Sequence, residues 1–234
     1  MEQLFYQPDL DQGADYLNEE ESKHCIKVLR KKSGEPFLLT DGKGSYYEAI
    51  IADANPRKCT FHITRKYAEP SRNFHIHLAI SPTKNPDRLE WMVEKCVEIG
   101  IDKITFINCE NTERPWLKTD RLKKVALSAM KQSQRATLPD LSDLISFQEF
   151  MQLNSGTDQR FIAYVDSSNP EHLMKKAEKG SNYLVLIGPE GDFSLPELEF
   201  AQRNGFQKVS LGKSRLRTET AGVVACCLLN ALQL

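Results

Sequence analysis

From residue 74 to the end of the chain, short apolar runs alternate with amphipathic segments, and this alternation restricts the fold more than any other feature. The apolar runs are typical of buried strands because they are brief and bounded by turn residues. They read FHIHLAIS, KITFIN, FIAYVD, YLVLIG and KVSLG. Nearly continuous apolar strands joined by helices are typical of a mostly parallel sheet that is covered on both faces. We therefore predict an α/β fold for this part of the chain.

The segments between these strands carry helix signals. PDRLEWMVEKCVEIG has one apolar helical face and a stop at Gly100, and DRLKKVALSAMKQSQR has a second apolar stripe. In FSLPELEFAQRNG, Ser194 and Glu197 match a capping box, Pro196 suits the first turn and Gly205 ends the helix. A last helix is predicted in AGVVACCLLNAL. The two apolar stripes consist of Leu89, Met92, Val93, Cys96 and Val97 in the first and Leu122, Val125, Ala126, Ala129 and Met130 in the second.

The first 70 residues have a different rhythm, with three short apolar runs, PFLLT, SYYEAIIA and KCTFHIT, between turn signals. The turn signals are Asp41-Gly42 and Lys43-Gly44 between the first two runs and Asn55-Pro56 after the second. This pattern predicts a small all-β unit of the barrel type, preceded by a short helix in EESKHCIKVLRKKSG. We therefore divide the chain into a β unit at 1–70 and an α/β domain at 73–234.

Composition excludes several classes of protein. Hydrophobic residues make up 40% of the chain and charged residues 27%, which predicts an ordinary buried core rather than disorder. No apolar run is long enough to span a bilayer, and MEQLFYQPDL lacks the features of a secretory signal. The net charge is -1, so binding to nucleic acid needs a local basic patch.

The residues that commonly bind metals show no metal-site pattern. The six cysteines form no Cys-x-x-Cys pair, and we interpret them as buried thiols of a cytosolic protein. His75 and His77 share one face of a predicted strand, but no carboxylate or cysteine stands close to them in the sequence. We therefore favour ordinary strand histidines over a metal pair and predict no metal site.

Ligands of such a sheet bind just outside the carboxyl ends of its strands, so the segments that follow the strands are the candidate sites. These segments are SPTKNPDR, NCENTERP, VDSSNP, GPEGD and GKSRLRTET. In LIGPEGDFS, Gly188 and Gly191 permit close approach of a ligand to the backbone. Taken alone, however, this segment reads as a strand-to-helix turn, since it matches neither the dinucleotide nor the triphosphate glycine motif.

GKSRLRTET concentrates polar chemistry in a turn between two apolar elements. A purely structural interpretation accounts for two of its residues, because Thr218 can cap the following helix and Glu219 can complement the helix dipole. That interpretation leaves Arg215 and Arg217 unexplained. Arginines at a predicted ligand edge suit an anionic partner such as a phosphate, a carboxylate or a base that loses its proton.

Basic residues gather in two places. One cluster surrounds the predicted helix in DRLKKVALSAMKQSQR and the other lies in the β unit. A solvated face is the default interpretation of any single charge, but two clusters in a nearly neutral chain favour contact with a phosphate backbone. The candidate RNA-binding residues are Lys23, Lys27, Arg30, Arg114, Lys118, Arg121, Lys124, Lys131 and Arg135.

Read together, these segments resemble one family. SPTKNPDRLEWMVEKCVEIGI, ENTERP, KQSQR followed by a proline, LIGPEG and LGKSRLRTETA stand in the order found in the uridine-N3 methyltransferases of small-subunit (16S) ribosomal RNA, a family of the SPOUT class. HCIKVLRKKSGEPFLLTDGKGSYYEAII resembles the PUA-like barrel of that family, so the resemblance covers nearly the whole chain. The pairing of LIGPEG with LG-x-x-x-LRTETA is its most specific part. The chain departs from the family pattern at Asn85 and Asp192, where glycine is usual, and at Pro115, where serine is usual.

The resemblance implies a SPOUT-type parallel sheet with a trefoil knot, a PUA-like RNA-binding barrel, S-adenosylmethionine (SAM) as cofactor, and a cytoplasmic homodimer whose substrate is ribosomal RNA or the small ribosomal subunit. It implies neither a membrane nor a metal. Arg217 is our first candidate for stabilising the charge that develops on uracil, and Glu219 or Glu190 could take its proton. The cofactor-binding residues expected from the two glycine loops are Leu186, Ile187, Gly188, Pro189, Glu190, Gly191, Leu211, Gly212, Arg215, Leu216, Thr218, Thr220 and Ala221.

Two alternatives stay open at this point. An enzyme of the same fold could act on another RNA target, such as a ribose 2'-hydroxyl or a transfer-RNA base. A non-catalytic RNA-binding protein that assists ribosome assembly could also keep the fold, although the complete LRTET segment argues against it.

Overall fold

The computed structural model describes residues 3–153, 159–164 and 170–234, which form two compact units. The first unit comprises the chain up to Ser71 together with Leu127–Leu138, and the second comprises Arg72–Ala126 and Pro139–Leu234. Residues 127–138, which the sequence division assigns to the α/β domain, thus group with the first unit. The reason is hydrogen bonding: Ala136 O accepts from Thr40 Oγ1 at 2.9 Å and from Gly44 N at 3.0 Å.

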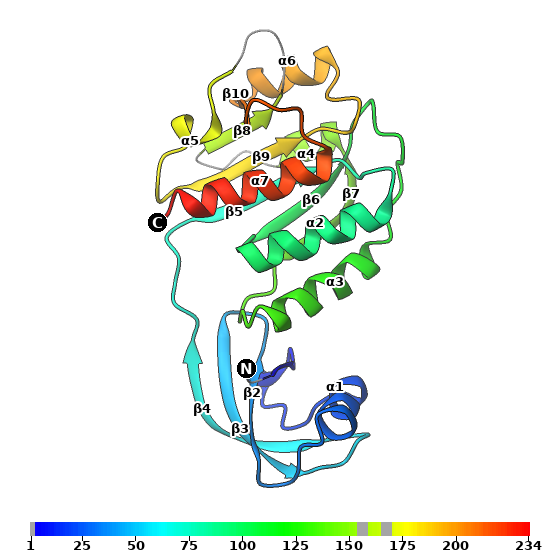
Figure 1. Cartoon of the computed structure of the whole chain (residues 1–234), viewed down its shortest axis with the longest axis vertical. Helices are drawn as coiled ribbons and strands as arrows, with labels where there is room; N and C mark the ends of the chain where they lie inside the picture. Colours follow the sequence, from blue (N-terminus) through cyan, green and yellow to red (C-terminus); the bar gives the residue numbers. More distant parts are fainter. Residues whose placement is uncertain (1–2, 154–158, 165–169) are drawn as a thin grey trace. The chain divides into compact units, whose positions relative to one another are not determined.

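The first unit is built on a four-stranded sheet in the order β1 (Leu4–Tyr6), β2 (Pro36–Thr40), β3 (Ser45–Asp53) and β4 (Thr60–Ala68) (Figure 1). β1 pairs with β2 in parallel, and the other neighbours are antiparallel. The three predicted strands are present. Among the described residues, the four strands form an open sheet and not the closed barrel that we expected, because β1 and β4 are its edge strands. The expected helix is short: α1 (Glu19–Lys23) runs into one π-helical turn, η2 (His24–Val28), and a 3-10 turn, η1 (Leu10–Gln12), precedes it.

The second unit contains a six-stranded sheet in which every pair of neighbours is parallel, as predicted. The five predicted strands all belong to it. A sixth strand, β7, was not predicted because it lies at the edge and its sequence, DLSDLIS, is largely polar. The strand order is β10 (Gln207–Val209), β8 (Gln159–Ala163), β9 (Asn182–Ile187), β5 (His75–Ile80), β6 (Lys103–Asn108) and β7 (Asp140–Ser146).

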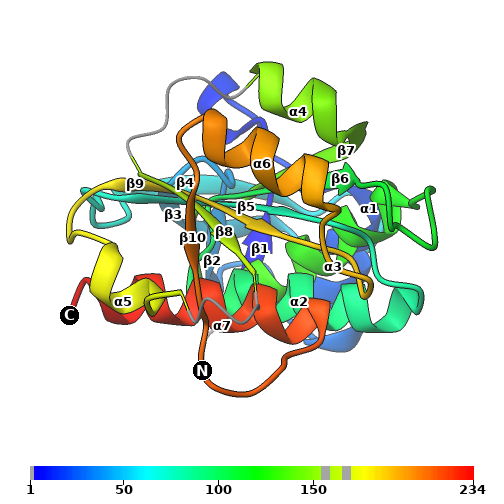
Figure 2. The same ribbon diagram turned by 90° about the horizontal axis from the view of Figure 1, so that it is seen from above.

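Helices cover both faces of this sheet (Figure 2). On one face lie α2 (Pro86–Ile99), α5 (Leu173–Lys176) and α7 (Thr218–Ala231), and on the other lie α4 (Phe147–Leu153) and α6 (Leu195–Arg203). The predicted apolar stripe of α2 is buried, with none of its five side chains more than 2% exposed. α7 approaches β5 closely at Gly222, where a Cβ atom would stand 3.0 Å from Ile80 Cδ1. The remaining helix, α3 (Thr119–Gln132), carries the second stripe, in which Leu122, Ala126, Ala129 and Met130 are buried.

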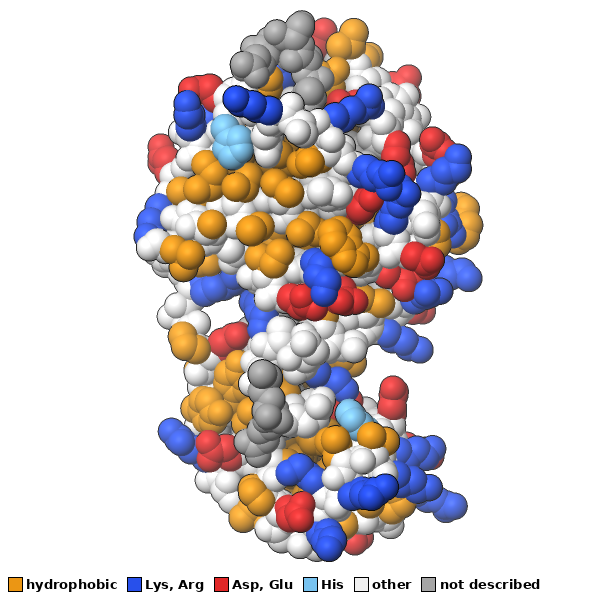
Figure 3. Space-filling view, in the orientation of Figure 1, with side chains coloured by type: hydrophobic (Ala, Val, Ile, Leu, Met, Phe, Trp, Pro, Cys, Tyr) orange, Lys and Arg blue, Asp and Glu red, His pale blue; other side chains and the backbone are white. Residues whose placement is uncertain are grey.

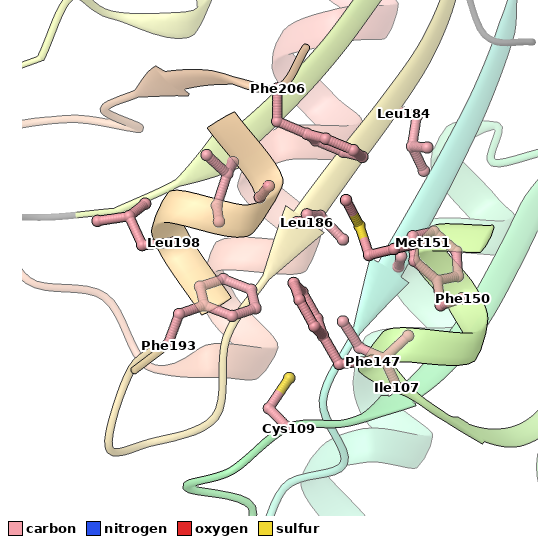
Figure 4. Close-up of a cluster of buried hydrophobic side chains, with 13 residues drawn as sticks. Ile107, Cys109, Phe147, Phe150, Met151, Leu184, Leu186, Phe193, Leu198 and Phe206 are labelled. Atoms are coloured by element: carbon pink, nitrogen blue, oxygen red, sulfur yellow. The ribbon is translucent and has the colours of Figure 1, made fainter. Parts of the chain in front are cut away.

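The face under α4 and α6 is sealed by a cluster of aromatic and aliphatic side chains (Figure 4). Phe147 and Phe193 contribute tilted rings with centroids 6.0 Å apart, and Leu186 reaches the cluster from β9. Phe193 stands two residues after the end of the LIGPEG segment. The loop that leaves β9 is therefore anchored in the core within a few residues of the strand end.

The helix boundaries follow the predicted signals closely. Ser194 and Glu197 form the capping box of α6, and Gly100 is the C-cap of α2. Asn85, one of the departures from the family pattern, is the N-cap of α2, and its side chain accepts a hydrogen bond from Asp87 N. An asparagine is thus well suited to this position because it satisfies a free N–H of the first turn.

The structure also bears on the expectations about the cysteines and about membrane-spanning segments. All six cysteines are free thiols, and five of them are buried. Within the described ranges, the helices are too short or too polar to cross a bilayer.

Burial of His77 makes the stability of the fold depend on pH. The ring is 5% exposed, and Nε2 lies 2.8 Å from Thr105 Oγ1 on the neighbouring strand. Burial lowers the pKa of His77 to about 3, with smaller contributions from Lys103 and His75. The unfolded chain, with a histidine pKa of about 6.5, binds a proton over the interval in which the folded protein does not. The free energy of unfolding therefore falls as the pH falls through that interval.

We predict that His77 accounts for about 2 kcal/mol of the stability lost between about pH 7 and about pH 5. Urea unfolding of the wild type and of His77→Gln at both pH values checks this, because glutamine does not titrate. The variant should lose about 2 kcal/mol less than the wild type. An equal pH dependence in the two proteins would contradict the assignment.

Candidate functional site

A pocket of about 520 Å³ opens at the carboxyl ends of β8, β9 and β10. This is the edge at which the sequence predicted a ligand site, and two of the predicted segments, GPEGD and GKSRLRTET, contribute to it. Its lining residues are Ala163, Tyr164, Ile187, Gly188, Pro189, Glu190, Asp192, Val209, Leu211, Gly212, Ser214, Arg215, Leu216, Arg217, Thr218 and Ala221.

The first wall is the loop that leaves β9. Close packing favours glycine at Gly188, since a Cβ atom there would stand 3.1 Å from the Phe193 ring and 3.2 Å from the Phe193 backbone N. Asp192 has a φ of 64°, a left-handed conformation that favours glycine but that aspartate tolerates. Its carboxylate Oδ1 accepts a hydrogen bond from Phe193 N at 2.8 Å. This conformation explains why a glycine is usual at the position and why aspartate can replace it.

The second wall is the segment between β10 and α7. Arg217, not Thr218, is the N-cap of α7, and the Arg217 side chain makes no capping hydrogen bond with the described residues. The predicted capping role of Thr218 is therefore wrong. Its hydroxyl instead donates to Gly188 O at 3.1 Å, in a buried hydrogen bond that ties the start of α7 to the first wall. Glu219 does lie in the first turn of the helix, as expected.

The two arginines of the second wall line the pocket and are exposed. Neither Arg215 nor Arg217 has a carboxylate within ion-pair distance in the described part of the chain. By contrast, Arg203 and Arg121 do form such pairs, at 2.9 Å from Glu199 and 2.6 Å from Glu90. An unpaired guanidinium beside a pocket is available to an anionic group of a ligand.

Two glutamates near the pocket each have one buried carboxylate oxygen without a hydrogen-bond partner among the described residues. Glu190 lines the pocket, and its other oxygen accepts from Lys84 N at 3.0 Å. Glu219 does not line the pocket; its Oε1 lies 3.8 Å from Arg88 Nε on α2. A buried carboxylate oxygen that lacks a donor is costly, so each group has capacity for a further hydrogen bond.

The loops after β5 and β6 meet the first wall. Glu113 pairs with Lys84 Nζ at 2.8 Å, and Arg114 donates from Nη1 to Lys84 O at 3.3 Å. Asn111 Nδ2 donates to Asp192 O at 3.0 Å. Three of the five predicted segments are therefore connected by hydrogen bonds at one edge of the sheet.

Most residues predicted to bind a cofactor line this pocket together, but three of them, Leu186, Gly191 and Thr220, do not. Glu219, predicted as catalytic, does not line it either. Sequence reasoning missed Ala163, Tyr164, Asp192, Val209 and Ser214 as lining residues. The position of Tyr164 at a strand end could have indicated it. Of the VDSSNP segment, residues 165–169 lie outside the described residues.

The candidate RNA-binding residues differ in availability. Lys27, Arg30, Lys118 and Lys124 are exposed, and none of them has an ion-pair partner in the described ranges. Lys23 pairs with Glu19 at 2.6 Å, and Arg121 pairs with Glu90. Lys131 pairs with Glu21 and keeps only 17% of its side chain exposed, which argues against a phosphate contact. Arg135 is half-buried.

Metal binding finds no support in the described segments, where no three His, Cys, Asp or Glu side chains come together as ligands. His77 is buried beside Thr105, and His75 is exposed. The pocket instead combines apolar side chains, backbone groups and arginines, a composition typical of a site for an organic ligand.

The chain matches two family models, an RNA methyltransferase domain over residues 70–230 and an RNA methyltransferase PUA domain over residues 17–64. Among curated proteins, it is 26% identical to ribosomal RNA small subunit methyltransferase E of Buchnera aphidicola, with 98% of this chain and 92% of the relative covered. The corresponding protein of Bacillus subtilis is also 26% identical, with 88% and 85% covered.

Two solved structures resemble the whole chain. A probable rRNA-methyltransferase from Porphyromonas gingivalis is 43% identical with a TM-score of 0.91, covering 99% of this chain and 98% of that one. A ribosomal RNA small subunit methyltransferase E from Neisseria gonorrhoeae, bound to S-adenosyl methionine, is 26% identical with a TM-score of 0.87, covering 100% and 98%. The chain therefore belongs to the RNA methyltransferase family whose curated members include ribosomal RNA small subunit methyltransferase E, and it carries the PUA domain of that family.

Proposed function

We propose that this protein transfers a methyl group from SAM to N3 of a uridine in small-subunit (16S) ribosomal RNA. The observation that carries the proposal is the pocket at the strand ends, whose two walls are the LIGPEG and LGKSRLRTET loops joined by the bond from Thr218 to Gly188. A relative that matches the whole length of this chain binds SAM.

The pocket fits the cofactor. Its volume of about 520 Å³ lies within the range of roughly 300 to 1,000 Å³ found for small-molecule sites. Ile187, Leu211 and Leu216 offer apolar contacts to a neutral, flat adenosyl group, and the backbone of both loops offers hydrogen bonds to its edge. SAM supplies an activated methyl group on a sulfonium. The chain then has to hold the acceptor nitrogen in line with that methyl group and keep water out.

Arg217 is proposed to stabilise the reacting base. Uracil N3 attacks well only after it loses its proton, and the resulting negative charge spreads to the two flanking carbonyl oxygens. Arg217 lines the pocket, is exposed and has no carboxylate partner in the described part of the chain. Its guanidinium can therefore meet that charge where it develops.

Of the two glutamates, we propose Glu190 as the proton acceptor, because it lines the pocket and holds one unpartnered oxygen. Glu219 lies behind the second wall, at the start of α7, and its Oε1 lies 3.8 Å from Arg88. We therefore propose that Glu219 positions the start of α7 and so the adjacent Arg217.

The substrate must present an unpaired uridine, because N3 lies on the pairing edge of the base. We propose that the base is read in a single-stranded or flipped state within a folded RNA. Exposed lysines and arginines without ion-pair partners would hold neighbouring phosphates. In the described ranges these include Lys118 and Lys124 in the second unit and Lys27 and Arg30 in the first.

Three finer features belong to the same proposal. The strand order, in which β8 lies between β10 and β9, supports a trefoil knot of the SPOUT type. Hydrophobic side chains gather over the face that carries α2 and α7 (Figure 3), and α7 leaves Val223, Val224 and Leu228 partly exposed, which supports a homodimer. A cytoplasmic location follows from a ribosomal RNA substrate.

The first prediction from the proposed function concerns the activity itself. Calorimetry should show that the protein binds SAM, and mass mapping of ribosomal RNA from a strain that lacks it should show one small-subunit uridine without its N3 methyl group. If that uridine stays methylated and another RNA loses a methyl group, the protein is an enzyme of the same fold with a different target. Absence of SAM binding would favour a ribosome-assembly factor.

The second prediction concerns Arg217. Replacement by alanine should lower the rate of methyl transfer about a hundredfold, which is the usual effect of removing one donor that stabilises developing charge. The affinity for SAM should change little. Single-turnover methylation with labelled SAM measures the rate, and calorimetry measures the affinity. Arg203→Ala is the matched control, because Arg203 pairs with Glu199 and lies outside the pocket. A normal rate in Arg217→Ala would end the charge-stabilising proposal.

The third prediction concerns the exposed lysines of the second unit. The double variant Lys118→Ala, Lys124→Ala should bind ribosomal RNA more weakly, and its affinity should depend less on salt. Each lost phosphate contact reduces the slope of log affinity against log salt by about 0.7 for single strands. Filter binding across a salt series gives the slope, with Arg203→Ala as a control for the loss of one positive charge from an arginine that is paired with a carboxylate. An unchanged slope would return both lysines to an ordinary solvated surface.

A further inference from the structure

A second, smaller pocket lies in the same unit, between the loop after β5, the first turns of α2 and α3, and the segment that follows β6. Its volume is about 90 Å³, and we call it the Trp116 pocket. Pro82, Leu89 and Leu122 give it apolar walls, and Trp116 lines it although 53% of this residue is exposed. A large aromatic ring left half exposed beside a pocket is a common element of ligand recognition.

The Trp116 ring is already stacked on a cation. The guanidinium carbon of Arg114 lies 3.6 Å from the ring centroid. The same guanidinium donates from Nη1 to Lys84 O at 3.3 Å, so its orientation is fixed by the backbone. Arg114 has no carboxylate within ion-pair distance in the described ranges. The charge that lies against the ring is therefore not neutralised.

Some of the other charged side chains around the pocket form ion pairs and others do not. Arg121 is paired with Glu90 at 2.6 Å, and Lys84 is paired with Glu113 at 2.8 Å. Lys118, which also lines the pocket, has no such partner among the described residues. The pocket thus offers two available cations and an aromatic ring over an apolar floor. These groups match a nucleotide, which has a flat base and a phosphate.

The Trp116 pocket and the larger pocket are joined through one residue. Lys84 N donates to Glu190 Oε1 at 3.0 Å, and Glu190 lines the larger pocket. Lys84 O accepts from Arg114, which is stacked on Trp116. A nucleotide at the Trp116 pocket would therefore lie beside a nucleotide whose base enters the larger pocket.

We propose that the Trp116 pocket binds the base of a nucleotide that flanks the methylated uridine, stacked with the Trp116–Arg114 pair and with its phosphate near Lys118. This inference rests on the proposed function, because it takes single-stranded RNA as the ligand. Stacking on an aromatic ring is tolerant of base identity, so the pocket fixes the position of the RNA strand rather than its sequence.

Tryptophan fluorescence gives a direct test, because the chain has only two tryptophans, Trp91 and Trp116. In Trp91→Phe, a short single-stranded oligouridylate should quench the emission of Trp116 saturably. In Trp116→Phe, the same RNA should leave the emission of Trp91 nearly unchanged. Inorganic polyphosphate, which carries charge but no base, should quench neither variant.

Two results of this titration would overturn the inference. One is an unchanged Trp116 emission at RNA concentrations that saturate binding by fluorescence anisotropy of a labelled oligouridylate. The other is equal quenching by polyphosphate, which would show a purely electrostatic site. Quenching by an unrelated apolar peptide but not by RNA would assign the pocket to a protein partner and would also overturn it.

Kinetics separates this inference from the proposed function. Trp116→Ala should raise KM for ribosomal RNA about tenfold, the size expected for one lost stacking contact, whereas kcat and the affinity for SAM should change little. Trp116→Phe, which keeps a ring, should restore most of the loss. A wild-type KM in Trp116→Ala would overturn the stacking site and leave the methyltransferase proposal intact. Quenching of Trp116 by RNA in Trp91→Phe, together with a wild-type protein that methylates no uridine, would overturn the methyltransferase proposal and leave the stacking site intact.

Discussion

The hydrogen bond from Thr218 Oγ1 to Gly188 O is the contact on which the arrangement of the larger pocket depends. It joins the first residue of α7 to the first residue after β9, two positions 30 residues apart in the chain. Because Thr218 is only 5% exposed, water cannot readily replace its partner. The bond fixes the start of α7, and with it the adjacent N-cap residue Arg217, against the loop that lines the opposite wall.

Lys84 extends this arrangement to the neighbouring loops through its backbone as well as through its charge. Its N–H donates to Glu190 and its carbonyl accepts from Arg114, while its ammonium group is paired with Glu113. Backbone groups have fewer conformations than a long side chain, so they hold their partners at lower entropic cost. The result is a continuous set of contacts from the larger pocket to the aromatic pair of Arg114 and Trp116.

Much of the second unit could be predicted because its local signals and its tertiary packing agree. The apolar stripe of α2, the capping box at Ser194 and the stop at Gly100 all have the predicted place. The edge strand β7 could not be predicted, since only one of its faces needs apolar residues and the alternation is weak over seven residues. The grouping of residues 127–138 with the first unit depends on long-range hydrogen bonds such as that of Thr40 to Ala136, which no local pattern reveals.

In the candidate site too, features that depend on nearby residues could be predicted, whereas contacts between residues far apart in the chain could not. Position at the strand ends indicated both walls, but the capping role predicted for Thr218 was wrong. The N-cap of α7 is Arg217, and the Thr218 hydroxyl donates to Gly188 O of a different loop. Arg215 and Arg217 could be singled out from the sequence because local structure gave them no role, and in the described residues they form no ion pair. Elsewhere on this nearly neutral chain, Lys23, Arg121 and Arg203 lie beside carboxylates. The chain has enough acidic residues to pair its arginines, yet those at the pocket have no ion pair within the described residues. Their charge is therefore available to a partner that is not part of the protein.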